Sequence, residues 1–472
     1  MRRLVFAAAV LSACTGLKSA VETTPPPVPD GGATSDDDDD DDTIDGDAGD
    51  VTPPDAGEPP ADFECDKDEW TKPTKTRSEC NPREVRLVEE TSTILTTGIA
   101  IAVTPAGRVG ISYNTEESQE QGRFHLAHFT PKTSGFTKPE VIERPALPYF
   151  HDGMRSRLAA TAPDTLHVLT YDVDDVDLVG KLRSTTLVDG KKPLTEPEVV
   201  GDSISGDSRI SFAVAPDGTA YAMARVAIDA TKAKLTAAKR EPGGAWTPLA
   251  DVPEMGLGLL PREAPGIGAS ALHVDPAGKL HLLFHYNDGI QVSTPRYHTY
   301  AATKWTFRKT VDNPATDGVT GYDPHLATFG NRRYALYFYR KAIQDPPQKA
   351  DLRLATWTGE DRAQIEIVDQ GIAAPEQDHP RYAAAMAIDK YGLVHLAIVR
   401  PTAANRAYLE YRRQQRIPGG GTKWLSDVVA PEVLGESADA HVALTVDDDA
   451  RPHIAYRSGA DSRVYYATRF DR

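Results

Sequence analysis

The sequence lacks several features by which the chemistry of a chain is usually recognised. No apolar run reaches 18 residues, so no segment is long enough for a transmembrane helix. Only three cysteines occur in 472 residues, too few for a metal site built on cysteine. Motifs for nucleotide binding, for a serine nucleophile and for a zinc protease are missing. The net charge of −17 argues against a nucleic-acid binder that neutralises phosphates.

The negative charge is concentrated near the beginning of the chain. Residues 1–61 hold fourteen acidic and three basic residues, so the remaining 411 residues are only mildly acidic. Residues 14–61 are rich in proline, aspartate, glycine and threonine, and they include seven consecutive aspartates at 36–42. Such a composition buries too little apolar surface to fold, so we predict a disordered acidic tether. A calcium site at 45–50 is the alternative, but it lacks a closing ligand at loop distance.

The first residues form an export signal. Met1, Arg2 and Arg3 precede a short apolar run at 4–11, as in a secretory signal peptide. That run ends in Leu11-Ser12-Ala13-Cys14, which resembles the lipobox of bacterial lipoproteins. The resemblance implies a signal peptide over 1–13, cleavage before Cys14 and acylation (palmitate) of that residue, with an ordinary signal peptide as the alternative. Thr15 favours the outer membrane, so we expect a lipid-anchored protein of the bacterial cell envelope.

The two other cysteines lie in a lead-in segment, residues 62–97. Cys65 and Cys80 are an even pair in an exported chain. We expect a disulfide between them, which would close a loop of about 15 residues.

Seven copies of one pattern fill residues 98–472. Each copy has a short apolar run, a turn and a second apolar run, and the turn centres are 53–61 residues apart. Turns such as Pro-Ala-Gly and Pro-Asp-Gly predict β-hairpins, and the continuous apolar runs indicate that both faces of each hairpin are covered. The hairpins are expected at residues 99–114, 158–172, 210–225, 271–286, 326–340, 384–400 and 442–457.

Further strands follow each hairpin. Third strands are expected at 124–130, 182–188, 235–240, 296–302, 352–358, 408–413 and 464–470, and fourth strands at sites such as 139–144, 364–369 and 425–430. Trp246, Trp305 and Trp424 precede fourth strands and indicate one repeated packing position. The last copy lacks a fourth strand, whereas residues 84–89 form a spare one. We therefore predict an all-β fold, a seven-bladed β-propeller closed by that N-terminal strand. The alternative is a two-sheet sandwich or a larger number of irregular blades.

The repeats resemble those of a known group of exported proteins. The stretch from Asp275 to Leu282, Asp-Pro-Ala-Gly-Lys-Leu-His-Leu, is similar to repeats of sialidase-like (BNR-type) propellers of bacteria. The Asp-box of sialidases, Ser-x-Asp-x-Gly-x-x-Trp, is missing from every copy. The resemblance therefore implies the fold but assigns no catalytic residue.

Histidine recurs at one strand position in four copies, as His167, His281, His395 and His453. Four histidines suggest a metal site. Equivalent positions on different blades are spread around a ring, however, beyond the reach of one ion. We therefore expect a structural role and no metal site.

Acidic residues followed by basic ones mark the start of the innermost strand in five copies. These candidate ligand-binding residues are Asp152, Arg155, Arg157, Asp207, Arg209, Asp323, His325, Asp378, Arg381, Asp439 and His441. In a propeller these positions converge on one mouth of the central channel. Arginine there would bind an anionic or hydroxyl-rich ligand, and histidine would transfer protons. Mutual pairing of these residues, without a ligand, is the structural alternative.

Two functions fit this pattern. We expect a non-enzymatic module whose propeller binds a glycan or a protein partner, because rigid propeller faces present loops from many blades. The alternative is a polysaccharide-acting enzyme, a sialidase-like glycosidase or a lyase, that uses the channel-mouth residues. We expect no cofactor beyond weak Ca²⁺ binding at the acidic loop tips 172–177 and 447–449, and no nucleic-acid partner. The sequence does not indicate the oligomeric state.

Overall fold

The computed structural model describes the part of the chain that carries the repeats. The described residues are 84–89, 99–118, 121–131, 140–143, 151–173, 180–191, 197–204, 210–227, 232–252, 257–258, 270–287, 293–301, 303–313, 319–340, 350–372, 384–401, 407–434, 441–458 and 463–469. The signal peptide, the tether, Cys14 and the pair Cys65 and Cys80 lie outside these residues. Every regular element in the described part is a strand, and none of its segments is a helix suited to crossing a membrane.

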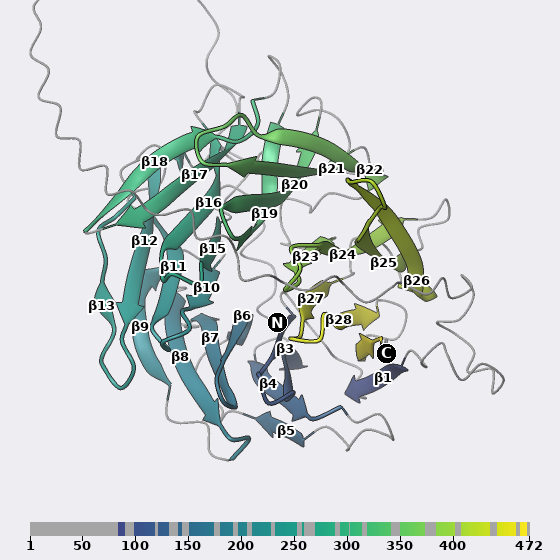
Figure 1. The fold of residues 1–472 in the computed structure, drawn as a ribbon. Helices are drawn as coiled ribbons and strands as arrows, with labels where there is room; N and C mark the ends of the chain where they lie inside the picture. Colours follow the sequence, from purple (N-terminus) through teal and green to yellow (C-terminus); the bar gives the residue numbers. More distant parts are fainter. Residues whose placement is uncertain are drawn as a thin grey trace, which may run out of the picture. The chain divides into compact units, whose positions relative to one another are not determined.

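Seven antiparallel blades follow one another around a central axis, as Figure 1 shows. Single parallel pairs, Gly122 with His151 and Ser293 with Val319, join blade 1 to blade 2 and blade 4 to blade 5. Blade 1 contains β2 (Ala100–Val103), β3 (Val109–Ser118), β4 (Gln121–Phe129) and β5 (Glu140–Glu143). Blade 2 contains β6 (His151–Thr161), β7 (Thr165–Val173), β8 (Gly180–Val188) and β9 (Glu198–Ile204). Blade 3 contains β10 (Ile210–Val214), β11 (Ala220–Ala227), β12 (Lys232–Arg240) and two short outer pieces, β13 (Thr247–Pro248) and β14 (Leu257–Gly258).

The remaining blades have the same order. Blade 4 contains β15 (Ser270–Val274), β16 (Leu280–Asn287), β17 (Ser293–Ala301) and β18 (Lys304–Thr310). Blade 5 contains β19 (Val319–Phe329), β20 (Arg332–Arg340), β21 (Ala350–Thr358) and β22 (Gln364–Ile372). Blade 6 contains β23 (Ala384–Ile388), β24 (Val394–Pro401), β25 (Ala407–Arg416) and β26 (Thr422–Leu434). Blade 7 contains β27 (Val442–Val446), β28 (Pro452–Ser458), β29 (Arg463–Thr468) and β1 (Glu84–Glu89).

The ring is closed by its first strand. β1 pairs antiparallel with β29, from Glu84 opposite Thr468 to Glu89 opposite Val464. The predicted seven-bladed propeller and its N-terminal closing strand are therefore confirmed. The two ends of the described chain share one sheet, so the outer edge of β29 is not left open.

The hydrophobic core lies between the blades. Among the described residues, seven clusters of buried side chains are found, and each combines residues of two neighbouring blades. Adjacent residues on one strand face opposite neighbours: Leu282 packs with blade 3, and Leu283 packs with blade 5. This arrangement explains the continuous apolar runs in the sequence, because both faces of each sheet are covered.

The tryptophans occupy one repeated position, as expected. The indole Nε1 of Trp305 in blade 4 donates to the carbonyl oxygen of Ala250 in blade 3 at 3.0 Å. The indole Nε1 of Trp424 in blade 6 donates to Glu366 in blade 5 at 2.6 Å. Trp246 in blade 3 packs against the cluster between blades 2 and 3. Each indole thus lies at the boundary with the preceding blade, although Trp305 and Trp424 lie within their fourth strands rather than before them.

Candidate functional site

The recurring histidines belong to a structural motif at the hairpin turns. In three blades the histidine Nε2 lies 3.0–3.2 Å from an aspartate six residues earlier, and Nδ1 lies 2.6–2.7 Å from a tyrosine hydroxyl on the third strand. The triads are Asp275–His281–Tyr297, Asp389–His395–Tyr411 and Asp447–His453–Tyr466. A neutral imidazole that donates to the aspartate accepts from the tyrosine.

The aspartate of each triad also fixes the turn. The second carboxylate oxygen of Asp275 accepts hydrogen bonds from the backbone N–H groups of Ala277 and Lys279, at 3.0 and 2.8 Å. The turn then passes through Gly278 at φ = 81°, a conformation that favours glycine. Burial acts to raise the pKa of Asp275, but the hydrogen bonds from His281 and the turn outweigh it, so its pKa is lowered. These histidines fasten turns within single blades, which accounts for their recurrence.

Metal ligands do not gather elsewhere in the described part of the chain, where no three His, Cys, Asp or Glu side chains come together as a metal site would require. At the acidic tip 447–449, Asp447 is engaged by His453 at 3.2 Å, and Asp449 pairs with Arg451 at 2.6 Å. Asp172 pairs with Arg183 at 3.1 Å. Weak calcium binding at these tips stays a prediction.

A pocket of about 210 Å³ lies on the axis of the propeller, at the side where the innermost strands begin. All seven innermost strands contribute residues to its wall. The seven innermost strands can be compared position by position through their pairing with the second strands. In each blade, the recurring histidine of the second strand, or the residue that replaces it, lies opposite one residue of the innermost strand. The innermost members of these pairs are Ala102, Ala159, Ala213, His273, Ala327, Ala387 and Thr445.

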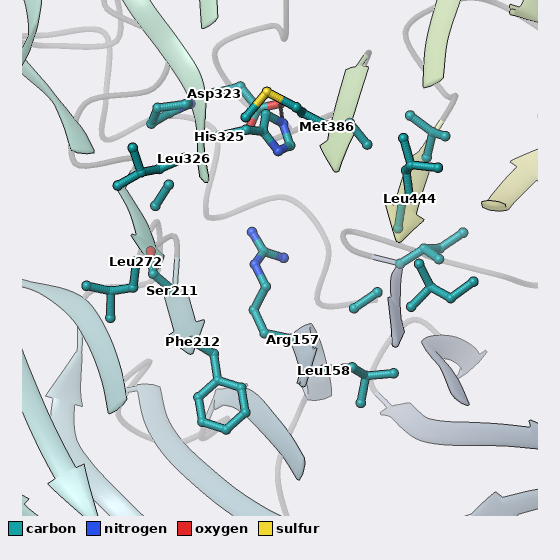
Figure 2. Close-up of a pocket in the computed structure, with 18 of the residues that line it drawn as sticks. Arg157, Leu158, Ser211, Phe212, Leu272, Asp323, His325, Leu326, Met386 and Leu444 are labelled. Atoms are coloured by element: carbon teal, nitrogen blue, oxygen red, sulfur yellow. Dashed lines mark ion pairs between the residues drawn. The ribbon is translucent and has the colours of Figure 1, made fainter. Parts of the chain in front are cut away.

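These seven residues serve as the reference position for each blade. Two residues before it, five blades have a small side chain and two have a large polar one. In blade order the seven residues are Ala100, Arg157, Ser211, Ala271, His325, Ala385 and Ala443, and all of them line the pocket. The five small residues leave the axial space open, and Arg157 and His325 fill part of it. Figure 2 shows the guanidinium of Arg157 extending into this space, with His325 and Asp323 on the opposite side.

The residue after each of these positions is apolar in every blade. We call this set the apolar collar: Ile101, Leu158, Phe212, Leu272, Leu326, Met386 and Leu444. Collar residues pack into the hydrophobic clusters between blades, so they fill the space between neighbouring sheets next to the pocket. Few of the described side chains that line the pocket are therefore polar.

The polar side chains of the pocket are held in place by local contacts. Arg157 Nη1 donates to the carbonyl oxygen of Ser156 at 3.0 Å. Asp323 is only 3% exposed, and its carboxylate lies 3.9 Å from His325 Nε2. Its φ of 45° falls in the left-handed region, within a bulge between Tyr322 and His325. Such a backbone conformation is costly for a residue other than glycine and is often found at functional sites.

The pocket brings together three of the eleven candidate residues, Arg157, Asp323 and His325. Arg155 and His441 are buried, at 3% and 4% exposure, but are not among the residues that line the pocket. Asp152 lies on β6, and its side chain is outside the described part. The other candidates, Asp207, Arg209, Asp378, Arg381 and Asp439, lie outside the described residues.

Sequence reasoning missed the residues that make the pocket. Ser211 and Ser270 line it, with their hydroxyl groups 2.6 Å apart, and neither was a candidate. Alanines and the apolar collar carry no chemical signal of their own. An alignment of the seven copies on the hairpin register would have shown that Arg157 and His325 stand where five copies have alanine or serine.

No protein-family profile and no curated protein sequence matches the chain. Among solved structures it is similar to an ulvan lyase bound to a sulfated GlcA–Rha disaccharide, at 12% identity and a TM-score of 0.46, over 81% of this chain and 98% of the lyase. It is similar to an α-L-arabinofuranosidase from Fusarium graminearum, at 13% identity and 0.45, over 66% and 91%. A sialidase from Streptococcus pneumoniae matches at 9% identity and 0.41, over 82% and 70%.

These structures correct one expectation. We expected a non-enzymatic binding module, and that expectation is contradicted, because glycoside hydrolases, a polysaccharide lyase and sialidases stand among the similar structures. Sialidase-like propellers are among them, as the repeats implied. Identities of 9–16% and TM-scores of 0.41–0.46 transfer no mechanism to this chain.

Proposed function

We propose that the chain is an enzyme that cleaves a carboxylated polysaccharide or glycan in its axial pocket. The observation that carries this proposal is the convergence of Arg157 with His325 and Asp323 in a pocket otherwise walled by small and apolar residues. Polar groups of opposite charge that converge in one concave site are a typical feature of active sites. Its volume of about 210 Å³ limits the reacting part of the ligand to the size of a sugar unit.

Each polar residue has a role that its chemistry supports. Arg157 is permanently charged and has a planar fork of donors, so it binds the substrate carboxylate. His325 is the proton-transfer group in the pocket, and the Asp323 carboxylate, 3.9 Å from its Nε2, favours the imidazolium that forms when it takes up a proton.

This set of groups favours elimination. His325 removes the proton beside the carboxylate, and the electron pair forms a carbon–carbon double bond as the glycosidic carbon–oxygen bond breaks. The leaving oxygen takes up the proton from the His325 imidazolium, which returns the histidine to its neutral form. Arg157 stabilises the negative charge that develops on the carboxylate. Hydrolysis by the usual route needs two carboxyl groups, and Asp323 is the one carboxylate among the described residues that line the pocket.

The test is a screen of the purified chain against acidic polysaccharides and sialylated glycans. We expect cleavage of at least one carboxylated substrate, with ultraviolet absorbance from the unsaturated product. New reducing ends without that absorbance would identify hydrolysis instead. Binding without cleavage across the whole screen would contradict the proposal. The neutral polymers from the same screen serve as controls, since they offer Arg157 no carboxylate.

We also propose that this enzyme is a lipoprotein of the bacterial cell envelope, held at the outer membrane. Leu11-Ser12-Ala13-Cys14 supports acylation at Cys14, and the proline- and aspartate-rich residues 14–61 support a tether. The chain expressed in a bacterium is expected to incorporate labelled palmitate and to partition with membranes. Cys14→Ser is expected to abolish both, and label retained by that variant would contradict the proposal.

A further inference from the structure

The polar side chains of the pocket lie on consecutive blades. Among the described residues that line it, the polar ones are Arg157 of blade 2, Ser211 of blade 3, Ser270 of blade 4, and Asp323 and His325 of blade 5. The order of the blades thus places the two serines between Arg157, which binds the carboxylate, and His325, which transfers the proton. Figure 2 shows Ser211 on the wall between these two residues.

The two serines form one hydrogen-bonded pair across the boundary between blades 3 and 4. Ser211 Oγ lies 2.6 Å from the carbonyl oxygen of Ser270 and 2.6 Å from Ser270 Oγ. A carbonyl oxygen can only accept, and a hydroxyl group has one proton, so Ser211 donates its proton to the carbonyl. The contact between the two hydroxyl oxygens is then made by the proton of Ser270. Both hydroxyl protons are therefore used within the pair.

The pair offers the pocket an acceptor rather than a donor. A hydroxyl oxygen has two lone pairs, and Ser270 Oγ uses neither of them when it donates to Ser211. Ser270 is 9% exposed and Ser211 is 3% exposed, so Ser270 is the member with more access to the pocket. A ligand group that meets Ser270 Oγ forms a hydrogen bond only if it brings its own proton.

We propose that Ser270, oriented by Ser211, is a specificity-determining residue that accepts a hydrogen bond from a free hydroxyl group of the bound carboxylated sugar. The inference rests on the proposed function and names a feature of the substrate class within it. Two groups of opposite character hold the sugar: Arg157 donates to its carboxylate, and Ser270 accepts from its hydroxyl group.

The preference follows from what each altered sugar leaves unpaired. A sugar with hydrogen in place of that hydroxyl group brings no donor to Ser270 Oγ. A sugar with a methoxy group there places one acceptor oxygen against another. A site that bonds a substrate hydroxyl discriminates against analogues without it, because a buried polar group of the site is left without its partner.

A second serine pair provides a matched control. The hydroxyl oxygens of Ser112 on β3 and Ser156 on β6 are also 2.6 Å apart, across the boundary between blades 1 and 2, and both residues are fully buried. Neither of them is among the residues that line the pocket. Ser112→Ala therefore breaks a hydroxyl pair between blades, as Ser270→Ala does, but leaves the pocket wall unchanged.

The probes are trisaccharides of galacturonate and of mannuronate. Each is used with all its hydroxyl groups free, and with the C2 or the C3 hydroxyl of the central unit replaced by hydrogen or by methoxy. The carboxylates are the same in all of them. Cleavage by the full chain gives kcat/KM for each probe, calorimetric titration gives the dissociation constants, and thermal unfolding reports on the stability of each variant.

We expect one of the two hydroxyl positions to matter. The chain is expected to prefer the free hydroxyl at that position over both analogues by at least tenfold in kcat/KM. Ser270→Ala is expected to reduce this preference to about twofold or less, because the acceptor is lost. Ser112→Ala is expected to retain the preference in full.

Ser211→Ala gives a different pattern. Without the oxygen of Ser211, the proton of Ser270 is available to the ligand, so a methoxy oxygen then has a donor. The preference for hydroxyl over methoxy is expected to fall by about fivefold, whereas the preference for hydroxyl over hydrogen is retained. The same loss of both preferences in Ser211→Ala and Ser112→Ala would show a merely structural role and overturn the inference.

Failure of the inference and failure of the proposed function give different results. Equal kcat/KM for all probes, or a full preference retained in Ser270→Ala, would overturn the inference and leave the proposed function standing. Tighter binding of the free hydroxyl form that Ser270→Ala removes, without any cleavage, would support the inference and contradict the enzymatic proposal. If no probe is bound or cleaved, the inference is overturned as well.

Discussion

Replacing Arg157 with alanine is expected to lower kcat/KM for a carboxylated oligosaccharide by about 10²- to 10³-fold, because a desolvated ion pair between enzyme and substrate is lost. The position equivalent to Arg157 is alanine in four blades, so the substitution is compatible with the strand. Arg157→Lys keeps the charge but not the planar fork, and is expected to lose about tenfold. The measurement is initial-rate kinetics on the best substrate from the screen.

A distant arginine provides the control. Arg416 is exposed and donates to the carbonyl oxygen of Tyr391 at 2.8 Å, away from the pocket. Arg416→Ala is expected to leave kcat/KM within about twofold, as is usual for an exposed surface substitution. Full activity of Arg157→Ala with unchanged thermal unfolding would remove the pocket from the mechanism.

Loss of the closing strand is expected to destabilise the whole ring. Val88 is the described side chain of β1 and is 8% exposed, packed between blades 7 and 1. Val88→Asp places a charge in that cluster and is expected to lower the free energy of unfolding by about 3–5 kcal/mol. Deleting residues 84–89 is expected to cost more, because the edge of β29 is then exposed and the ring is no longer fastened. Denaturant unfolding measures both effects.

The same substitution on an ordinary outer strand is the control. Ile367 lies on β22, the outer strand of blade 5, and is 47% exposed. Ile367→Asp is expected to change the free energy of unfolding by no more than about 0.5 kcal/mol. If Val88→Asp changed the free energy of unfolding as little as Ile367→Asp does, then pairing of β1 would not stabilise the closed ring.

Most of the fold could be predicted from the sequence because each blade repeats its own signals. An apolar run, a turn and a second run recur with a period that no sandwich shares, and the missing fourth strand at the end matches the spare strand at 84–89. Blade 3 departs from the pattern, since its outer strand is two short pieces around Thr247–Pro248 and Leu257–Gly258. Proline lacks the N–H group that a longer ladder needs there.

Less of the site could be predicted, for a physical reason. Arg157, Asp323 and His325 stood out because they carry charge or titrate, but so did residues that do not line the pocket, such as Arg155. The pocket itself depends on the small size of residues such as Ala271 and Ala385. In a single sequence, an alanine that leaves space for a ligand looks like any other alanine. The triad histidines were recognised as structural, but their aspartate and tyrosine partners appeared only once the third strand was in place.

The direction of β1 determines at which end of the blades the chain enters the propeller. Glu84 pairs with Thr468, and Thr468 donates to the carbonyl oxygen of Pro452 beside the hairpin turn of blade 7. The chain thus joins the propeller on the turn side, whereas the pocket opens on the other side, where the innermost strands begin. The residue at which β1 begins and the residues that line the pocket therefore belong to opposite ends of the blades. A substitution or label at Glu84 is accordingly expected to leave the pocket wall unchanged.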